Sequence, residues 1–289
     1  MLTATTLAGA VAIALYLIAT RLVARGLLAS ADSILPHDPA LSAANDEHAS
    51  RRRTALFAGI LSAGGIIGHG LMTYGLLLSG QGLQLDLLTA LVVLLLIATL
   101  FVAASSFVIP VGSLLLYTLP GSAIAIALRL LLPYDAEPIR SLPTPLILHI
   151  LFALIAYGIL IMGATQSIIV GYQESRLRRR DHNALLATLP PMETMERLLF
   201  AMIWLGFAVL TIAIVTGFLY LEDLFAQRVV HHTVLASMSW LVYATLLTGR
   251  YLFGWRGTIA VRFTMVAFVL LLLAYLGSKF VIEVLLVEP

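Results

Sequence analysis

The sequence predicts an all-α protein, a membrane bundle of eight transmembrane helices. Three observations carry this prediction. Hydrophobic residues make up 61% of the 289 residues, and charged residues make up only 11%. The mean hydropathy of +1.01 is too high for a soluble globular chain of ordinary composition. Eight windows are also long and apolar enough to cross a bilayer core about 30 Å thick, which needs roughly 20 helical residues.

The eight predicted spans are joined by connections that contain turn and helix-start signals. The first span lacks the basic N-terminal region of a signal peptide, which favours a true helix. Pro110 ends the third span and permits a tight reversal, and Pro120 inside the fourth predicts a kink. Pro190 and Pro191 suit the start of the sixth span. The spans cover residues 4–23, 55–78, 87–108, 111–132, 145–172, 198–220, 231–249 and 260–286.

Charge distribution predicts how the chain crosses the membrane. Two polar stretches, residues 26–54 and 173–197, are the predicted cytoplasmic linkers. With alternating spans, thirteen of the seventeen basic residues fall on the side of these linkers. The excess of arginine on cytoplasmic loops therefore predicts that both termini lie on the non-cytoplasmic side. Because no polar segment is long enough for a soluble domain, residues 1–289 are expected to form a single transmembrane domain.

Several classes of chemistry have no residues to support them. The chain has no cysteine, which excludes disulfides, thiolate metal sites and covalent haem attachment through CxxCH. The pI near 9.0 is explained by membrane topology, and no nucleic-acid partner is expected. The sequence contains no HExxH, P-loop or GxSxG motif and no paired intramembrane carboxylates. We therefore expect that the protein is not an enzyme.

Histidines are the candidate functional residues. Four of the seven lie in or at the ends of apolar spans, where an ionisable residue is a functional candidate by default. These four are His69, His149, His231 and His232. The others lie in polar segments and are expected to be solvated; they are His37, His48 and His182.

His149 lies four residues inside the outer end of the fifth span, roughly 6 Å deep at 1.5 Å per residue. His231 and His232 begin the seventh span on the same side of the membrane. Small residues follow on both spans and leave room for a flat ligand or for a close helix neighbour. Since neutral imidazole is a common axial ligand of haem iron, His149 with His232 or His231 is a candidate haem site. The alternative is hydrogen bonding of these histidines to lipid headgroups or exposed backbone.

His69 and Lys279 each allow two interpretations. His69 lies in the glycine-rich sequence GGIIGHG of the second span, where Gly64 and Gly68 form a GxxxG pair typical of close helix packing. A structural role for His69 therefore stands beside a cofactor-binding role. Lys279 and Glu283 are four residues apart near the end of the eighth span and can neutralise each other. The alternative for Lys279 is an ion or a haem propionate.

Three stretches carry a family resemblance: LHILFALIAYGIL at 148–160, LPPMETMERLLF at 189–200 and SWLVYA at 239–244. The first resembles the LHV…SYA segment, and the third the TWLVYA segment, of the CcsA/HemX-like cytochrome c assembly family. The order of elements looks closest to the YpjD-type inner-membrane branch. The resemblance implies a multi-pass protein of the bacterial inner membrane that handles haem, with His149 as an external haem ligand.

The chain also departs from this family. Haem-exporting members carry a tryptophan-rich WWD segment before TWLVYA, whereas residues 220–232 here read YLEDLFAQRVVHH and contain no tryptophan. The histidine of the family's LHTR sequence is replaced by Gly249, and the terminal GLHSY histidine has no counterpart after Gly277. These losses predict a haem-binding accessory protein rather than a full haem exporter and synthase. The alternative is a non-catalytic scaffold or regulatory subunit that has lost haem and binds another inner-membrane protein.

Overall fold

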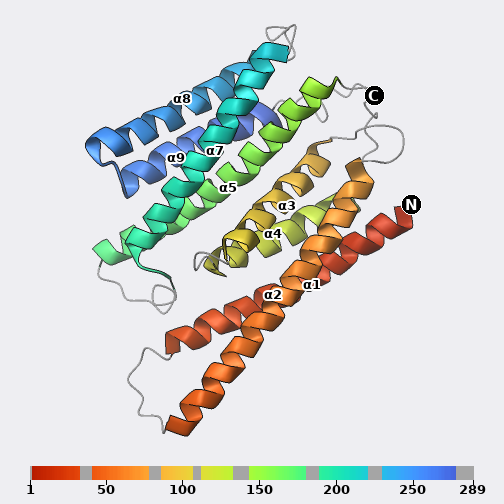
Figure 1. Cartoon of the computed structure of the whole chain (residues 1–289), viewed down its shortest axis with the longest axis vertical. Coiled ribbons are helices and arrows are strands. Elements are labelled where there is room, and N and C mark those ends of the chain that lie inside the picture. Colours follow the sequence, from red (N-terminus) through yellow and green to blue (C-terminus); the bar gives the residue numbers. More distant parts are fainter. Residues whose placement is uncertain are drawn as a thin grey trace. The chain divides into compact units, whose positions relative to one another are not determined.

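The computed structural model describes residues 2–32, 41–77, 86–106, 112–132, 143–179, 189–220 and 230–277 (Figure 1). Within these residues the chain forms eight α-helices and no strand, which confirms the all-α prediction. A π-helical turn, η1 (Leu273–Gly277), follows the last helix directly. The helices are α1 (Leu2–Asp32), α2 (Leu41–Leu77), α3 (Leu87–Ser105), α4 (Gly112–Leu131), α5 (Thr144–Arg178), α7 (Met192–Tyr220), α8 (Val230–Phe253) and α9 (Thr258–Leu272).

Seven of the described helices are long and apolar enough to cross a membrane. The other is α8, which has 24 residues but carries histidine, serine and threonine side chains among its apolar ones. The prediction of a multi-pass helical membrane protein is confirmed. The side of the membrane on which the termini lie stays a prediction.

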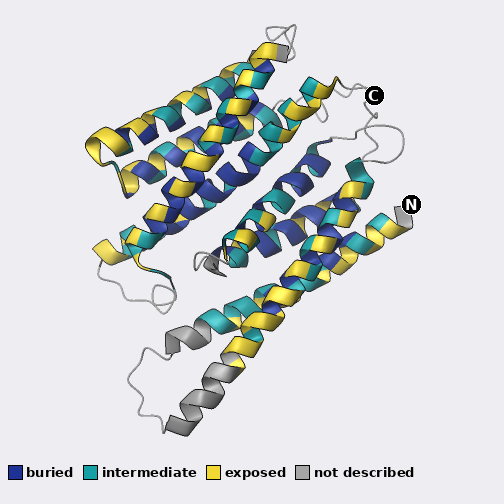
Figure 2. Cartoon of the chain, in the orientation of Figure 1, coloured by how far each residue is buried: buried dark blue, intermediate teal, exposed yellow. Residues whose placement is uncertain are grey.

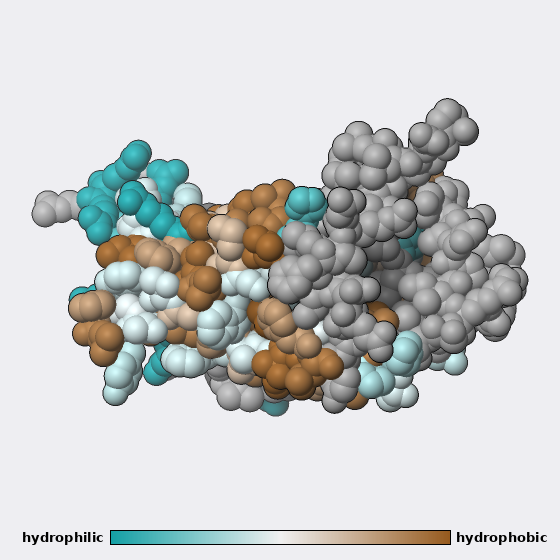
Figure 3. Space-filling model, turned by 90° about the horizontal axis from the view of Figure 1, so that it is seen from above, coloured by the Kyte–Doolittle hydropathy of each residue, from teal (hydrophilic) through white to brown (hydrophobic). Residues whose placement is uncertain are grey.

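The surface of the described helices is largely apolar. Most helices carry buried residues along one side and exposed residues along the other (Figure 2). Large apolar side chains are among the exposed ones, including Ile60 at 66%, Leu71 at 60% and Leu241 at 57% exposure. On the face shown in Figure 3, apolar side chains reach the surface over much of the described part. Such side chains suit contact with lipid tails, which are as apolar as leucine.

Helix boundaries differ from the prediction at the polar linkers. α2 begins at Leu41, so the second half of the predicted linker 26–54 is helical. Residues 41–54 are rich in alanine and arginine and contain neither glycine nor proline, which favours helix although the stretch is polar. α5 likewise continues to Arg178, beyond the predicted end at 172. Apolarity marks the membrane-crossing part of a helix but does not mark where the helix ends.

The chain divides into two compact units, which are described separately. Unit 1 contains α1, α2, α4 and α3 from Leu91 onward, and unit 2 contains α5, α7, α8, α9 and η1. Nothing in this division tests whether residues 1–289 act as one transmembrane domain, which stays a prediction.

In unit 1, α1 and α2 pack closely and run antiparallel. A Cβ atom added at Gly65 would lie 2.6 Å from the Tyr16 ring, and one at Gly68 would lie 3.0 Å from the Ala8 carbonyl oxygen. The glycine-rich part of α2 therefore serves close helix packing, as the GxxxG pattern predicts. Side chains of α1, α2 and α4 form the core of this unit; they are Ala12, Tyr16, Ala19, Met72, Leu119, Ala123 and Ile126.

In unit 2, a hairpin joins α8 to α9 and is held by side chains of α5 and α7. The backbone N–H of Gly257 donates to Glu196 of α7 at 2.8 Å, and Thr258 Oγ1 donates to Glu174 of α5 at 2.9 Å. Gly257 has a φ of 56°, which favours glycine. These contacts fix the end of the hairpin against α5 and α7. The opposite ends of α5, α7 and α8 are thereby positioned to form a pocket.

Candidate haem pocket

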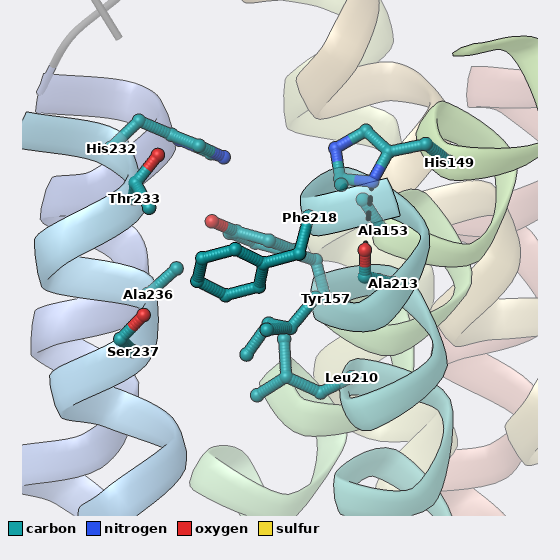
Figure 4. Close-up of a pocket in the computed structure, with 12 residues that line it drawn as sticks. His149, Ala153, Tyr157, Leu210, Ala213, Phe218, His232, Thr233, Ala236 and Ser237 are labelled. Atoms are coloured by element: carbon teal, nitrogen blue, oxygen red, sulfur yellow. Dashed lines mark hydrogen bonds between the residues drawn. The ribbon is translucent and has the colours of Figure 1, made fainter. Parts of the chain in front are cut away.

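A small pocket lies in unit 2 between α5, α7 and α8 (Figure 4). Its cavity volume is about 50 Å³, and most of its lining is apolar. The lining residues are His149, Ala153 and Tyr157 of α5, Leu210, Ala213, Ile214, Gly217 and Phe218 of α7, and His232, Thr233, Ala236 and Ser237 of α8. Two of the histidines singled out by the sequence therefore meet in one pocket, although they are far apart along the chain.

A backbone carbonyl fixes the ring of His149. The Nδ1 atom lies 2.8 Å from the carbonyl oxygen of Ala213 and 3.4 Å from Thr216 Oγ1, both on α7. A carbonyl oxygen only accepts, so His149 Nδ1 carries the proton and donates it. In the neutral imidazole, Nε2 then has the free lone pair that a metal ion requires.

His232 is held in the same way by a different element. Its Nδ1 atom donates to the carbonyl oxygen of Ala274 in η1 at 3.0 Å. Residues of π-helical turns occur frequently at functional sites, and here the turn supplies the carbonyl that orients the ring. Figure 4 shows the rings of His149 and His232 directed toward each other across the pocket. Fixing Nδ1 through an outer hydrogen bond and presenting Nε2 is the usual arrangement of metal-binding histidines.

Tyr157 adds a polar group that sequence reasoning did not select. Its side chain is 8% exposed, and its hydroxyl is buried without a hydrogen-bond partner among the described residues. The ring packs edge-on against Tyr275 of η1, with 5.8 Å between ring centroids. The available signal was spacing, because His149, Ala153 and Tyr157 follow one another at intervals of four on one helix face.

The pocket matches a haem in donor chemistry but not in size. Ligand pockets typically enclose roughly 300–1,000 Å³, several times the cavity of about 50 Å³ found here. The Phe218 ring lies in the middle of the pocket in the view of Figure 4, and this side chain is 50% exposed. The cavity in this conformation is therefore too small for a haem, and haem binding requires the side chains that line it to move.

The remaining histidines named by the sequence lie elsewhere. His231 precedes His232 on α8 but is exposed and does not line the pocket. His69 is fully buried in unit 1. There its Nε2 atom is 3.1 Å from the Val92 carbonyl oxygen and its Nδ1 atom is 3.2 Å from the Tyr16 hydroxyl. Because both ring nitrogens are used, the geometry favours the structural interpretation of His69.

Some candidate residues fall outside the described part of the chain. His37, His182, Lys279 and Glu283 lie outside the described residues, and the side chain of His48 is likewise not described. Among the residues that the structure describes, no group of three or more histidine, aspartate or glutamate side chains is placed to hold a metal ion.

Packing explains why residue 249 is a glycine. A Cβ atom at this position would overlap the ring of Trp255. The same turn is closed by Arg250, whose guanidinium donates to the Trp255 carbonyl oxygen at 3.1 Å. The α8–α9 hairpin thus leaves no space for a side chain at Gly249, and the pocket residue His232 lies at the other end of α8.

Comparison with known proteins agrees with the fold and the sequence motifs. The family model described as cytochrome C assembly protein matches residues 59–286. The inner membrane protein YpjD of Escherichia coli K12 is 31% identical over 204 residues, covering 70% of this chain and 76% of the relative. An uncharacterized 28.8 kDa protein of Azospirillum brasilense is 37% identical over 141 residues, covering 48% of this chain and 52% of the relative. No solved structure matches the chain.

The family match covers well over half of the chain, and the relative from E. coli is described as an inner membrane protein. Together with the seven apolar helices, these matches place the protein in the inner membrane as a multi-pass protein. The chain belongs to the cytochrome C assembly protein family.

Proposed function

We propose that this protein binds haem in the α5–α7–α8 pocket and acts as an accessory protein of cytochrome c assembly, with His149 and His232 as the residues that would hold the haem. One observation carries the proposal. Two imidazoles from different helices each donate from Nδ1 to a backbone carbonyl, at 2.8 and 3.0 Å, and both line one apolar pocket. This arrangement leaves an Nε2 lone pair on each ring, and both residues would be able to bind a haem iron through it.

The surroundings of the two histidines support the same ligand. Small residues, including Ala153, Ala213 and Ala236, line the pocket beside apolar ones, and a flat hydrophobic macrocycle requires such walls. Haem bound there would supply an iron centre capable of one-electron redox chemistry. The chain's own part is to hold and orient that group. The proposal assigns no catalytic step to the protein, in keeping with the missing tryptophan-rich segment at 220–232.

The test is the absorption spectrum of the full chain purified in mild detergent from haem-sufficient cells, with haem quantified as the pyridine haemochrome. We expect a reducible Soret band at about one haem per chain. His149→Ala and His232→Ala are each expected to weaken or shift this band. His231→Ala is the matched control on α8, because its side chain is exposed and outside the pocket. Unchanged spectra in both pocket variants would sink the proposal.

A second candidate function rests on the size of the pocket. A cavity of about 50 Å³ with Phe218 in its lining suits a chain that retains the family scaffold without its cofactor. Such a protein would act as a scaffold or regulatory subunit for another inner-membrane protein. A colourless purified protein that also fails to take up added haem would favour this function, and His149 would then be replaceable without functional loss.

A further inference from the structure

A second and larger cavity lies in unit 1, at one end of the antiparallel pair α1 and α2. Its volume is about 520 Å³, which falls within the range of roughly 300–1,000 Å³ typical of ligand sites. The described lining contains no acidic side chain. The lining residues are Leu22, Val23, Gly26 and Leu27 of α1, Arg52, Thr54, Ala55, Ala58 and Gly59 of α2, and Ser106 and Leu115.

The lining combines polar and apolar side chains. Arg52 begins the apolar window of α2, and the α4 window begins at Leu114, so the cavity lies at the edge of the membrane-crossing region. Arg52, Thr54 and Ser106 supply its polar groups, while Leu22, Ala58 and Leu115 are apolar. A cavity with a cationic end at the membrane boundary and an apolar interior is complementary to an amphiphile with an anionic head.

Arg52 is the cationic group available to such a head. Among the described residues its guanidinium has no hydrogen bond or ion pair. Arg178 and Arg250 of unit 2 differ, because they donate to Glu174 and to the Trp255 carbonyl oxygen, respectively. The positive-inside rule puts Arg52 on the cytoplasmic side, where the leaflet is rich in anionic lipid and basic pockets between helices bind lipid headgroups.

Two glycines leave the cavity open. A Cβ atom added at Gly26 or at Gly59 would meet no atom within 4 Å. Further along the same helix pair, Tyr16 and Ala8 occupy the space beside Gly65 and Gly68. Close packing of α1 and α2 therefore explains Gly65 and Gly68 but not Gly26 and Gly59. A glycine inside a helix weakens that helix relative to alanine, and the missing Cβ atoms of Gly26 and Gly59 leave space in the cavity that Arg52 also lines.

We propose that this cavity binds one anionic phospholipid, with the phosphate on the Arg52 guanidinium and an acyl chain in the space beside Gly26 and Gly59. A guanidinium pairs with a phosphate through two parallel hydrogen bonds, and the apolar walls accept the chain. The site lies in unit 1 and does not depend on haem binding in unit 2.

The experiment is native mass spectrometry of the delipidated full chain, titrated with dioleoyl phosphatidylglycerol or with dioleoyl phosphatidylcholine, which has the same chains and no net charge. We expect tighter binding of phosphatidylglycerol. Arg52→Gln should weaken it about five-fold, the effect of one basic residue near a membrane surface. Arg53→Gln is the matched control, since this neighbour does not line the cavity, and it should bind as the wild type does. An equal loss of phosphatidylglycerol affinity in both variants would indicate a general effect of surface charge and would contradict the proposed site.

A second pair of variants tests the acyl chain. Gly59→Leu puts an apolar side chain into the cavity at a position where a Cβ atom meets no neighbour within 4 Å, and it should reduce binding of both lipids. Gly70→Leu, at a position of α2 where a Cβ atom likewise meets no neighbour but outside the cavity, should not. Thermal unfolding in the same detergent verifies that both variants fold. Glycerol 3-phosphate, which has the headgroup charge but no chain, should not compete. Wild-type lipid binding by Gly59→Leu, or full competition by glycerol 3-phosphate, would contradict the proposal.

Discussion

In His149 and His232, a backbone carbonyl group determines which ring nitrogen carries the proton. Nδ1 of His149 donates to Ala213 on α7, and Nδ1 of His232 donates to Ala274 in η1. His69 has both nitrogens occupied inside unit 1. The same residue type therefore takes two roles in one chain. The difference is decided by how many hydrogen-bond partners surround each ring, because only a histidine with an unused nitrogen can bind a ligand there.

Two buried tyrosines provide a matched test at this scale. Tyr157 has no hydrogen-bond partner for its hydroxyl among the described residues, whereas the Tyr16 hydroxyl is 3.2 Å from His69 Nδ1. Tyr157→Phe removes an unsatisfied polar group, so we expect the free energy of unfolding without ligand to be unchanged or raised by about 1 kcal/mol. Tyr16→Phe leaves His69 Nδ1 unpaired in the interior and should lower the free energy of unfolding by about 1–3 kcal/mol.

Thermal unfolding of both variants in one detergent measures this difference. A lower melting temperature for Tyr157→Phe, in protein freed of haem, would show that its hydroxyl has a structural partner. A melting temperature equal to that of the wild type for Tyr16→Phe would show that the hydrogen bond to His69 contributes nothing to stability.

At the scale of elements, glycines decide how closely helices approach. In the α1–α2 pair, Gly65 faces the Tyr16 ring, and in the α5–α7 pair, Gly206 faces Leu160. In unit 2 the α8–α9 hairpin likewise requires a small residue at Gly249, against which Trp255 packs. Close packing of this kind replaces the hydrophobic driving force that is absent between helices surrounded by lipid.

Gly65→Ala and Gly70→Ala test this packing on one helix. At Gly65 the new Cβ atom would lie 2.6 Å from the Tyr16 ring, whereas at Gly70 it would meet no atom within 4 Å. We expect Gly65→Ala to destabilise unit 1 by about 1–3 kcal/mol through overpacking. Gly70→Ala should be neutral or stabilise it by up to about 1 kcal/mol through helix propensity. Melting temperatures that move in the same direction would contradict a packing role for Gly65.

At the scale of the whole molecule, the distribution of arginine predicts the orientation in the membrane. Thirteen of the seventeen basic residues fall on the predicted cytoplasmic side, and α5 ends there with Arg176 and Arg178 in its last turn. Its other end, near Thr144, and the histidine pocket would then face away from the cytoplasm. A haem in the pocket would be accessible from that outer side.

Single cysteines at the two ends of α5 test this orientation, because the natural chain has none. Thr144 and Arg179 are both exposed, so each can be labelled. A membrane-impermeant maleimide added to cells with a permeabilised outer membrane should label Thr144→Cys strongly and Arg179→Cys only after lysis. The reverse pattern would invert the topology and would place the haem pocket on the cytoplasmic side.

Several features of the site could be predicted from the sequence, and each had a local cause. His149 was identifiable because an ionisable residue in an apolar helix is costly and because its surroundings resemble a family motif. The choice of His232 over His231 was not accessible, since a shift of one residue at a helix start decides which ring faces the pocket. Tyr157 was missed although it follows His149 and Ala153 at intervals of four, because this spacing also occurs in ordinary helix packing.

The sequence by itself determined that this is an all-helical, multi-pass membrane protein, because a chain this apolar can satisfy its backbone hydrogen bonds in a bilayer only within its own helices. Its resemblance to a known family added the inner membrane. Only the tertiary structure decided which histidines share a pocket, because helices distant in sequence bring His149 and His232 together. It also decided which glycines pack against neighbours and which leave space, since this depends on what stands opposite each one. Local composition determines the elements, and the contacts between elements determine the sites.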